Sequence, residues 1–175
     1  MFKYKKITLI ITLVLVFLGN LLIYASSIND EEVFIKNGSR DKKLIALTFD
    51  DGPHPKETNQ VLDILNKYKV TGVIHSFSGS YETACIYIKM GYLLGINGVI
   101  TFKNCNLKDV VEKLDLGNIV LETDSPYLTP VPYRGKRNDP SHVWEIAEYI
   151  ADLKVVSVEE LSKETNGNIA RCFDI

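Results

Sequence analysis

Residues 72–104 read GVIHSFSGSYETACIYIKMGYLLGINGVITFKN, and this stretch decides the fold class. Two short apolar runs, 72–77 and 92–98, have the length and composition of buried strands. Between them, Ala84, Cys85 and Ile88 lie at helical spacing within residues 81–90. Strand, helix and strand in this order predict two parallel strands joined by a helix that covers them.

The same alternation continues in both directions along the chain. Upstream, residues 43–49 (KLIALTF) are predicted as a buried strand and residues 57–68 as a helix. Downstream, the pattern predicts a helix at 107–114, a strand at 118–122, and helices near 141–153, 158–164 and 168–173. Ser157, with Glu160 three residues later, has the pattern of a capping box at the start of the helix 158–164. The sequence therefore predicts an α/β fold built from parallel βα units.

The N-terminal 27 residues have the composition of an export signal. Lys3, Lys5 and Lys6 precede an apolar run at residues 7–24, and the small residues Ala25, Ser26 and Ser27 follow. Residues 1–27 are therefore predicted to be a signal peptide or an uncleaved membrane anchor, which places the rest of the chain outside the cytoplasm. Residues 28–42 are polar and are predicted to be a linker.

Charge and cysteine content exclude several classes of protein. The net charge is −2, and the only charged residues among the first 27 are lysines, so the remainder is more acidic than the whole. An acidic chain has no overall electrostatic attraction for nucleic acid, and phosphate binding would require a local site. The three cysteines (Cys85, Cys105 and Cys172) are far apart and form no CxxC pair, which excludes a zinc ribbon.

Polar residues follow the predicted strands where parallel α/β folds place their sites. Asp50 and Asp51 follow the first strand, His75 lies in the second, and Asp124 follows the fourth. Because function collects at the carboxyl ends of parallel strands, these residues are candidates for one site. Each also has a structural interpretation: Asp50, Asp51 and Asp124 could stabilise turns, and His75 could be a core residue.

Residues 42–71, KKLIALTFDDGPHPKETNQVLDILNKYKVT, resemble the opening strand, loop and helix of NodB-type polysaccharide deacetylases. In the T-F-D-D-G-P motif of that family the first aspartate is the general base and the second binds a divalent metal. The resemblance implies these roles for Asp50 and Asp51 and an N-acetylated glycan as substrate. The H-x-x-x-H pair of that family is not found, since the histidines are His54, His75 and His142.

Residues 72–175 resemble instead the C-terminal part of TatD-type metal-dependent hydrolases. The resemblance is carried by the stretch quoted above and by IVLETDSPYLTPVPYRGKRNDPSHV (119–143). It implies half of a (β/α)8 barrel with phosphodiesterase activity, in several members on DNA. By the same resemblance His75 is a metal ligand, and Asp124 binds metal and activates water. The family's remaining ligands belong to the half of the barrel that has no counterpart here.

The domain assignment that follows is a signal or anchor (1–27), a linker (28–42), a NodB-like βα segment (43–71) and a TatD-like half-barrel (72–175). The fold class is an incomplete (β/α) barrel, because a complete one needs about 250 residues. Such a fragment leaves an open sheet edge, which predicts self-association. Arg134, Lys136 and Arg137 form a local basic cluster, in which Arg134 and Arg137 are candidate phosphate ligands; a solvated loop is the alternative.

The preferred function is metal-dependent hydrolysis of phosphodiesters such as DNA, weak or inactive because the ligand set is incomplete. Asp51, His75 and Asp124 are the candidate ligands for Zn, Mn or Mg, with Asp124 and Asp50 as candidate catalytic residues. One alternative is an exported polysaccharide deacetylase. A second is a non-functional product of a gene fusion, in which case a cytoplasmic location replaces the exported one.

We expect the full-length chain to fractionate with membranes. An 18-residue helix over residues 7–24 is about 27 Å long, close to the roughly 30 Å of a bilayer's hydrocarbon core. Membrane fractionation followed by alkaline extraction measures this, and a chain lacking residues 1–27 is the control. Recovery of the uncleaved chain in the soluble cytosolic fraction would contradict the prediction.

Overall fold

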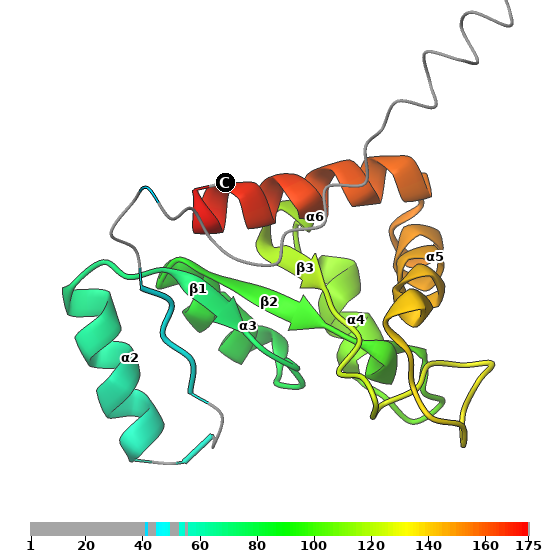
Figure 1. Cartoon of the computed structure of the whole chain (residues 1–175), viewed down its shortest axis with the longest axis horizontal. Helices are drawn as coiled ribbons and strands as arrows, with labels where there is room; N and C mark the ends of the chain where they lie inside the picture. Colours follow the sequence, from blue (N-terminus) through cyan, green and yellow to red (C-terminus); the bar gives the residue numbers. More distant parts are fainter. Residues whose placement is uncertain (1–40, 42–44, 50–52, 55, 175) are drawn as a thin grey trace, which may run out of the picture. The chain divides into compact units, whose positions relative to one another are not determined.

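The computed structural model describes residues 41, 45–49, 53–54 and 56–174 (Figure 1). The chain divides into two units, Met1–Ala46 and Leu47–Ile175, and the second contains the helices and strands described below. In chain order these are α2 (Glu57–Lys67), β1 (Gly72–Ile74), α3 (Tyr81–Lys89), β2 (Tyr92–Ile96), η1 (Gly98–Thr101), α4 (Leu107–Lys113), η2 (Leu116–Asn118), β3 (Ile119–Leu121), η3 (Pro140–His142), α5 (Val143–Lys154) and α6 (Val158–Phe173). The predicted βα alternation is confirmed from α2 onward.

The strands form a parallel sheet in the order β1-β2-β3, with β2 in the centre (Figure 1). Ile74 pairs with Leu94, and Leu94 pairs with Ile119 on the other side. Backbone hydrogen bonds continue past the strand ends, from the N–H of Phe77 to the carbonyl of Gly95 (2.9 Å) and from the N–H of Glu122 to that of Ile96 (3.1 Å). These bonds fix the segments that follow β1 and β3 relative to β2.

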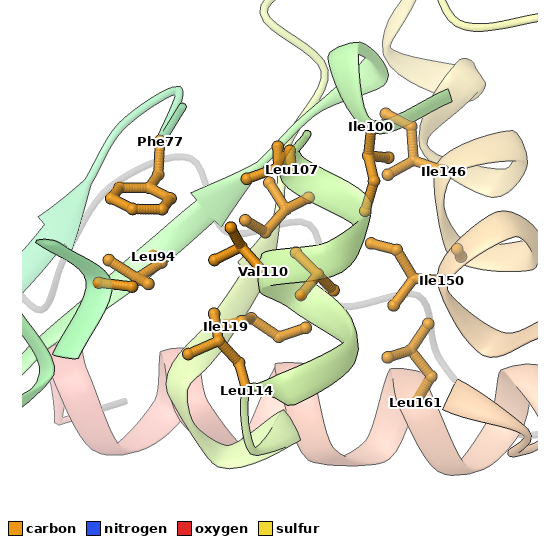
Figure 2. Close-up of a cluster of buried hydrophobic side chains, with 14 of the residues drawn as sticks. Phe77, Leu94, Ile100, Leu107, Val110, Leu114, Ile119, Ile146, Ile150 and Leu161 are labelled. Carbon is orange, nitrogen blue, oxygen red and sulfur yellow. The ribbon is translucent and has the colours of Figure 1, made fainter. Parts of the chain in front are cut away.

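One hydrophobic core lies between the sheet and its helices (Figure 2). Leu94, Ile96 and Ile119 contribute the strand side chains, and all three are at most 1% exposed. Helices α3, α4, α5 and α6, together with Leu114 at the C-cap of α4, contribute the remaining members: Ala84, Leu107, Val110, Val111, Leu114, Ile146, Ile150 and Leu161. Because side chains alternate across a strand, Gly95 lies on the opposite face of β2 from Leu94 and Ile96. The core therefore leaves that opposite face of the sheet for other groups.

Helix α6 corrects the prediction of two separate helices at 158–164 and 168–173. It is continuous through Gly167, although a mid-helix glycine costs about 1 kcal/mol relative to alanine. The side chain of Asn168, 1% exposed, donates to the carbonyls of Leu116 and Ile119, both at 2.7 Å. These buried bonds attach the helix to the start of β3, so tertiary contacts outweigh the local cost of glycine.

The start of α6 shows half of the predicted capping box. The hydroxyl of Ser157 accepts a hydrogen bond from the backbone N–H of Glu160 at 3.1 Å. At the start of α3, the hydroxyl of Ser80 accepts from the N–H of Thr83 in the same way. Each hydroxyl satisfies one of the N–H groups that a helix N-terminus leaves without an intrahelical partner.

The prediction of a buried strand at 43–49 is wrong for the residues that the structure describes. Residues 45–49 form no strand, and the side chains of Ile45, Leu47 and Phe49 are 87%, 62% and 61% exposed. A strand requires hydrogen bonds to a neighbouring strand in addition to an apolar pattern. Within the described part of the chain the sheet therefore has three strands where the sequence predicted four.

Two predicted segments cannot be compared with the structure. The signal peptide or anchor (1–27) and the linker (28–42, except Asp41) lie outside the described residues. Among the helices that the described residues form, none has the length and apolar character needed to cross a bilayer.

The two outer edges of the sheet bear on the predicted self-association. In the described part of the chain, β1 and β3 each pair with β2 and with no other strand. Edge strands expose N–H and C=O groups that can pair with another chain. Self-association through these edges remains a prediction.

We expect Asn168→Ala to lower the free energy of unfolding by about 2 kcal/mol or more. The substitution leaves one buried and one partly buried carbonyl without this partner, and the loss of a buried bond costs about 1–3 kcal/mol. Asn166→Ala on the exposed side of the same helix is the matched control, with an effect of about 0.5 kcal/mol or less. Urea denaturation followed by circular dichroism measures both, and equal effects would contradict the assignment.

Candidate active site

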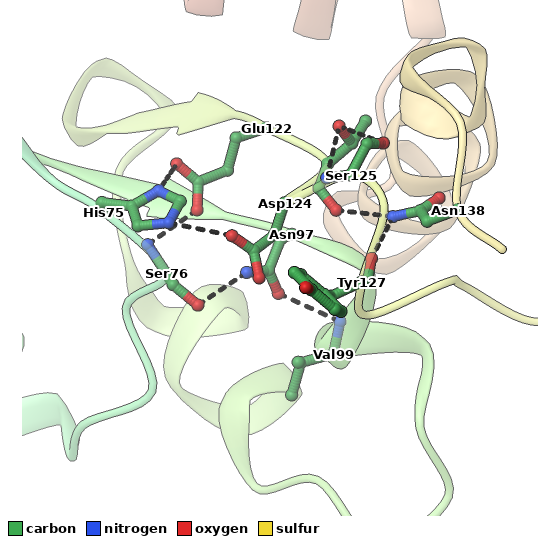
Figure 3. A network of polar contacts seen from close by, with 10 residues as sticks. His75, Ser76, Asn97, Val99, Glu122, Asp124, Ser125, Tyr127 and Asn138 are labelled. Carbon is green, nitrogen blue, oxygen red and sulfur yellow. Dashed lines mark hydrogen bonds and ion pairs between the residues drawn. The ribbon is translucent and has the colours of Figure 1, made fainter. Parts of the chain in front are cut away.

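His75, Glu122 and Asp124 meet at the carboxyl ends of β1 and β3 (Figure 3). The Nδ1 atom of His75 lies 2.9 Å from an oxygen of Glu122, and its Nε2 atom lies 3.0 Å from an oxygen of Asp124. The imidazole ring is therefore held between two carboxylates. The side chain of His75 is 64% exposed, whereas those of Glu122 and Asp124 are 19% and 28% exposed.

Glu122 is held by the segment that follows β1 and lies against β2. One oxygen accepts a hydrogen bond from the backbone N–H of Ser76 at 2.7 Å, and the other contacts His75. Its carboxylate occupies the space above Gly95, where a Cβ atom would lie 2.8 Å from the carboxyl carbon. Gly95 is therefore required by this close approach, and any larger residue would displace Glu122.

Left-handed backbone conformations position the residues around the imidazole. Ser76, directly after His75, has φ +50°, and Asp124 has φ +56°. Such conformations cost energy for residues other than glycine and are often found at functional sites. The buried side chain of Asn97 supports this region, because its amide donates to the hydroxyl of Ser76 (2.8 Å) and its oxygen accepts from the N–H of Val99 (3.1 Å).

The two carboxylates raise the pKa of His75 above its ordinary value of 6.5. The hydrogen bond to Glu122 is the largest cause, and the charges of Glu122 and Asp124 act in the same direction. Burial opposes them, since it disfavours the imidazolium. The protonated ring donates from both nitrogens, so the metal-free site favours imidazolium.

The donor atoms fit part of a metal site. Imidazole nitrogen and carboxylate oxygen are common ligands of Zn and Mn, and His75 Nε2 and Asp124 Oδ1 converge. Glu122 binds the other ring nitrogen, as carboxylates commonly do when histidine ligates a metal. Because the ring separates the two carboxylates, no cluster of three or more ligand-type side chains around one point is found among the described residues.

The other predicted site residues have different outcomes. Asp50 and Asp51 lie outside the described residues. The guanidinium of Arg134 stacks on the ring of Phe102 at 3.7 Å and donates to the carbonyl of Thr129 at 3.2 Å. Arg137 is exposed on the same loop. The phosphate-binding role of both arginines remains a prediction.

Sequence reasoning missed Glu122, Gly95 and Asn97. Glu122 precedes Asp124 by two residues, and residues at this spacing on an extended segment lie on one side, which was an available signal. The roles of Gly95 and Asn97 depend on contacts between strands. No local pattern in the sequence indicates such contacts.

Comparison with known proteins gives a family match for most of the chain. The family model described as TatD related DNase matches residues 54–174. The chain belongs to the TatD family.

Two curated relatives of the chain are named as metal-dependent hydrolases. The chain is 41% identical over 121 residues to an uncharacterized metal-dependent hydrolase of Buchnera aphidicola. It is 46% identical over 118 residues to the uncharacterized metal-dependent hydrolase YcfH of Escherichia coli. These alignments cover 69% and 65% of the chain but only 46% and 44% of the relatives. The chain thus spans about half the length of the curated relatives that it matches.

A solved TatD homologue supports the same fold. YJJV from Escherichia coli superposes with a TM-score of 0.61 and 27% identity, over 69% of this chain and 48% of that one. A TatD-family hydrolase from Entamoeba histolytica superposes with a TM-score of 0.56 at 21% identity, which bears on the fold alone. The parallel βα units of the described chain are therefore TatD-like.

These comparisons do not support the predicted deacetylase-like segment. The TatD match begins at residue 54, upstream of the predicted junction at Gly72, and includes helix α2. The deacetylase resemblance rested on the strand, T-F-D-D-G-P motif and helix of residues 42–71, and the helix of that segment falls within the TatD match. A short motif can occur in an unrelated context.

We expect Glu122→Gln to lower the pKa of His75 in the metal-free protein, because it removes the main cause of the raised value. Gly95→Ala should act in the same direction by displacing Glu122. In the native protein His75 contributes stability below pH 6.5, and this contribution is lost as the pH rises through the raised pKa. Titration of the histidine ring protons by NMR measures the shift, with His54→Asn and His142→Asn identifying the resonances of the two other histidines. An unchanged pKa in both variants would contradict the assignment.

Proposed function

We propose that this TatD-family protein is a metal-dependent hydrolase of phosphodiester bonds, including those of DNA. The observation that carries the proposal is the arrangement of His75 between Glu122 and Asp124 at the carboxyl ends of parallel strands. The names of similar proteins support the substrate class: the family model is described as TatD related DNase. A protein of Enterocytozoon bieneusi, 34% identical over 123 residues, is named a putative deoxyribonuclease.

His75 Nε2 and Asp124 would hold the divalent metal. When bound, the metal lowers the pKa of water and polarises a phosphoryl oxygen. Asp124 has a second carboxylate oxygen that can accept a proton from attacking water, since only Oδ1 contacts His75. Glu122 would accept a hydrogen bond from the Nδ1–H group of neutral His75, which leaves the lone pair on Nε2 for the metal.

Two ligands imply weak metal binding by this cluster. Catalytic zinc sites commonly use three protein ligands. We propose that further ligands come from residues outside the described cluster, such as Asp51, or from a second chain at the open sheet edge. Membrane association through residues 7–24 belongs to the same proposal and places the reaction at a membrane surface.

Titration with Mn or Zn tests the metal site on the full-length chain. We expect His75→Ala and Asp124→Ala to weaken binding strongly, and Glu122→Gln to weaken it about 10–100-fold through the orientation of His75. Asp109→Ala on the exposed side of α4 is the matched control and should bind like the wild type. Hydrolysis of bis(p-nitrophenyl) phosphate should follow the same order among the variants.

Three outcomes would overturn the proposal. Metal binding that is abolished by Asp51→Ala and unchanged by Asp124→Ala would assign the site to the T-F-D-D-G-P segment. Acetate release from an acetylated glycan, together with no phosphodiester hydrolysis, would assign a deacetylase activity. Absence of metal binding in the folded wild-type protein would favour a non-enzymatic product.

A further inference from the structure

A small cavity lies between the loops that follow β1 and β2. It has a volume of about 320 Å³ and is lined by Ser78 and Gly79 from the first loop and by Val99, Phe102, Asn104 and Asn106 from the second, among others. This volume is at the lower end of the range for small-molecule sites, about 300–1,000 Å³. The cavity can therefore accept a group of about one ring system.

The residues that line the cavity are connected to the candidate active site by short stretches of chain and by hydrogen bonds. Ser78 follows His75 by three residues, so the two Cα atoms are at most about 11 Å apart. On the other wall, the N–H of Val99 donates to Asn97, and Asn97 donates to Ser76 beside Glu122 (Figure 3). Both walls of the cavity are thus continuous with the groups that hold His75.

The lining suits an uncharged, planar, polar group. Val99 and Phe102 offer apolar surface, and the amides of Asn104 and Asn106 offer both donors and acceptors. The side chains that line the cavity carry no carboxylate, ammonium or guanidinium group. A nucleobase, which has a π-face and an edge of donors and acceptors, matches these properties, whereas a phosphate does not.

A cation stacks on one of the residues that line the cavity. The guanidinium of Arg134 stacks on Phe102 at 3.7 Å, and one of its N–H groups donates to the carbonyl of Thr129. The loop that carries Arg134 is attached to η1, because the N–H of Val131 donates to the hydroxyl of Thr101 at 2.9 Å. Arg134 is therefore held in place, and its other N–H groups can bind two oxygens of a phosphate.

The charges of the two segments support an anionic ligand. Residues 99–109 and 129–139 contain five basic residues, Lys103, Lys108, Arg134, Lys136 and Arg137, against the two acidic residues Asp109 and Asp139, although the chain as a whole carries a net charge of −2. A local basic surface in an acidic chain attracts phosphate where the chain as a whole does not. The neutral cavity and the basic surface together match the two parts of a nucleotide.

We propose that the cavity binds one nucleobase of the substrate and that Arg134 binds the phosphate attached to it, next to the phosphodiester that is cleaved. The proposal rests on the phosphodiesterase function proposed above and assigns to that function a preference for nucleotide substrates. Arg134 is a positioning residue in this scheme, since it fixes the strand beside the reacting phosphodiester.

Ligand-observed NMR titration of the metal-free, full-length chain tests the proposal. The probes are the dinucleotide TpT, thymidine and dimethyl phosphate. We expect TpT to bind more tightly than the other two. Arg134→Ala should weaken the binding of TpT about tenfold and leave the binding of thymidine unchanged. The loss of one charge-assisted contact corresponds to about a tenfold change in affinity. Arg134→Lys, which lacks the planar fork, should restore only part of the affinity.

Asn104→Trp fills the cavity and should weaken TpT and thymidine but not dimethyl phosphate. Asn166→Trp on α6 is the matched control and should bind all probes like the wild type. Circular dichroism establishes whether each variant is folded. If Arg134→Ala does not fold, Asn104→Trp provides the test. Equal binding of TpT by Asn104→Trp and the wild type, or equal affinity of the wild type for dimethyl phosphate and TpT, would overturn the proposal.

His75→Ala separates this inference from the proposed function. We expect it to abolish metal binding and hydrolysis while it leaves the metal-free affinity for TpT unchanged. If the wild type binds TpT tightly but does not hydrolyse bis(p-nitrophenyl) phosphate, the proposed function is overturned and the nucleotide subsite is retained. Hydrolysis without cavity-dependent TpT binding would overturn the subsite alone.

Discussion

The contact of the Glu122 carboxylate with His75 and Ser76 is the interaction on which the site depends. One oxygen accepts from the backbone of Ser76 and the other contacts His75, so a single side chain at the end of β3 fixes the segment after β1. The interaction crosses over β2, and only Gly95 leaves room for it. The orientation of the imidazole toward Asp124 follows from this arrangement.

The core explains why short strands can hold this geometry. Leu94 and Ile96 of β2 are fully buried on the helix side, and Asn168 connects α6 to the start of β3 by two hydrogen bonds. Packing on one face of the sheet therefore sets the positions of Gly95 and Glu122 on the other. The low exposure of Glu122 strengthens its interaction with His75, since charges that are partly removed from water interact more strongly.

The candidate site and the neighbouring cavity use the same structural elements. The loop after β1 contributes His75, Ser76 and Ser78, and the loop after β2 contributes Asn97, Val99 and Phe102. The stacking of Arg134 on Phe102 connects a third loop to them. A neutral cavity beside a fixed cation and the candidate metal ligands His75 and Asp124 is an arrangement suited to a nucleotide joined by a phosphodiester.

The sequence by itself determined the parallel βα order from residue 57 onward and singled out His75 and Asp124 as candidate site residues, because hydrophobic periodicity and a specific motif are local properties of the chain. It did not determine the fate of residues 45–49, whose apolar pattern resembles a strand but which form none. It also divided α6 at Gly167, since local propensity contains no information about the buried bonds of Asn168. The partnership of Glu122 with His75 and the need for glycine at position 95 were decided only by the tertiary structure. Both arise where three strands meet, and the distance between residues 47 positions apart in the chain is set by packing rather than by sequence pattern.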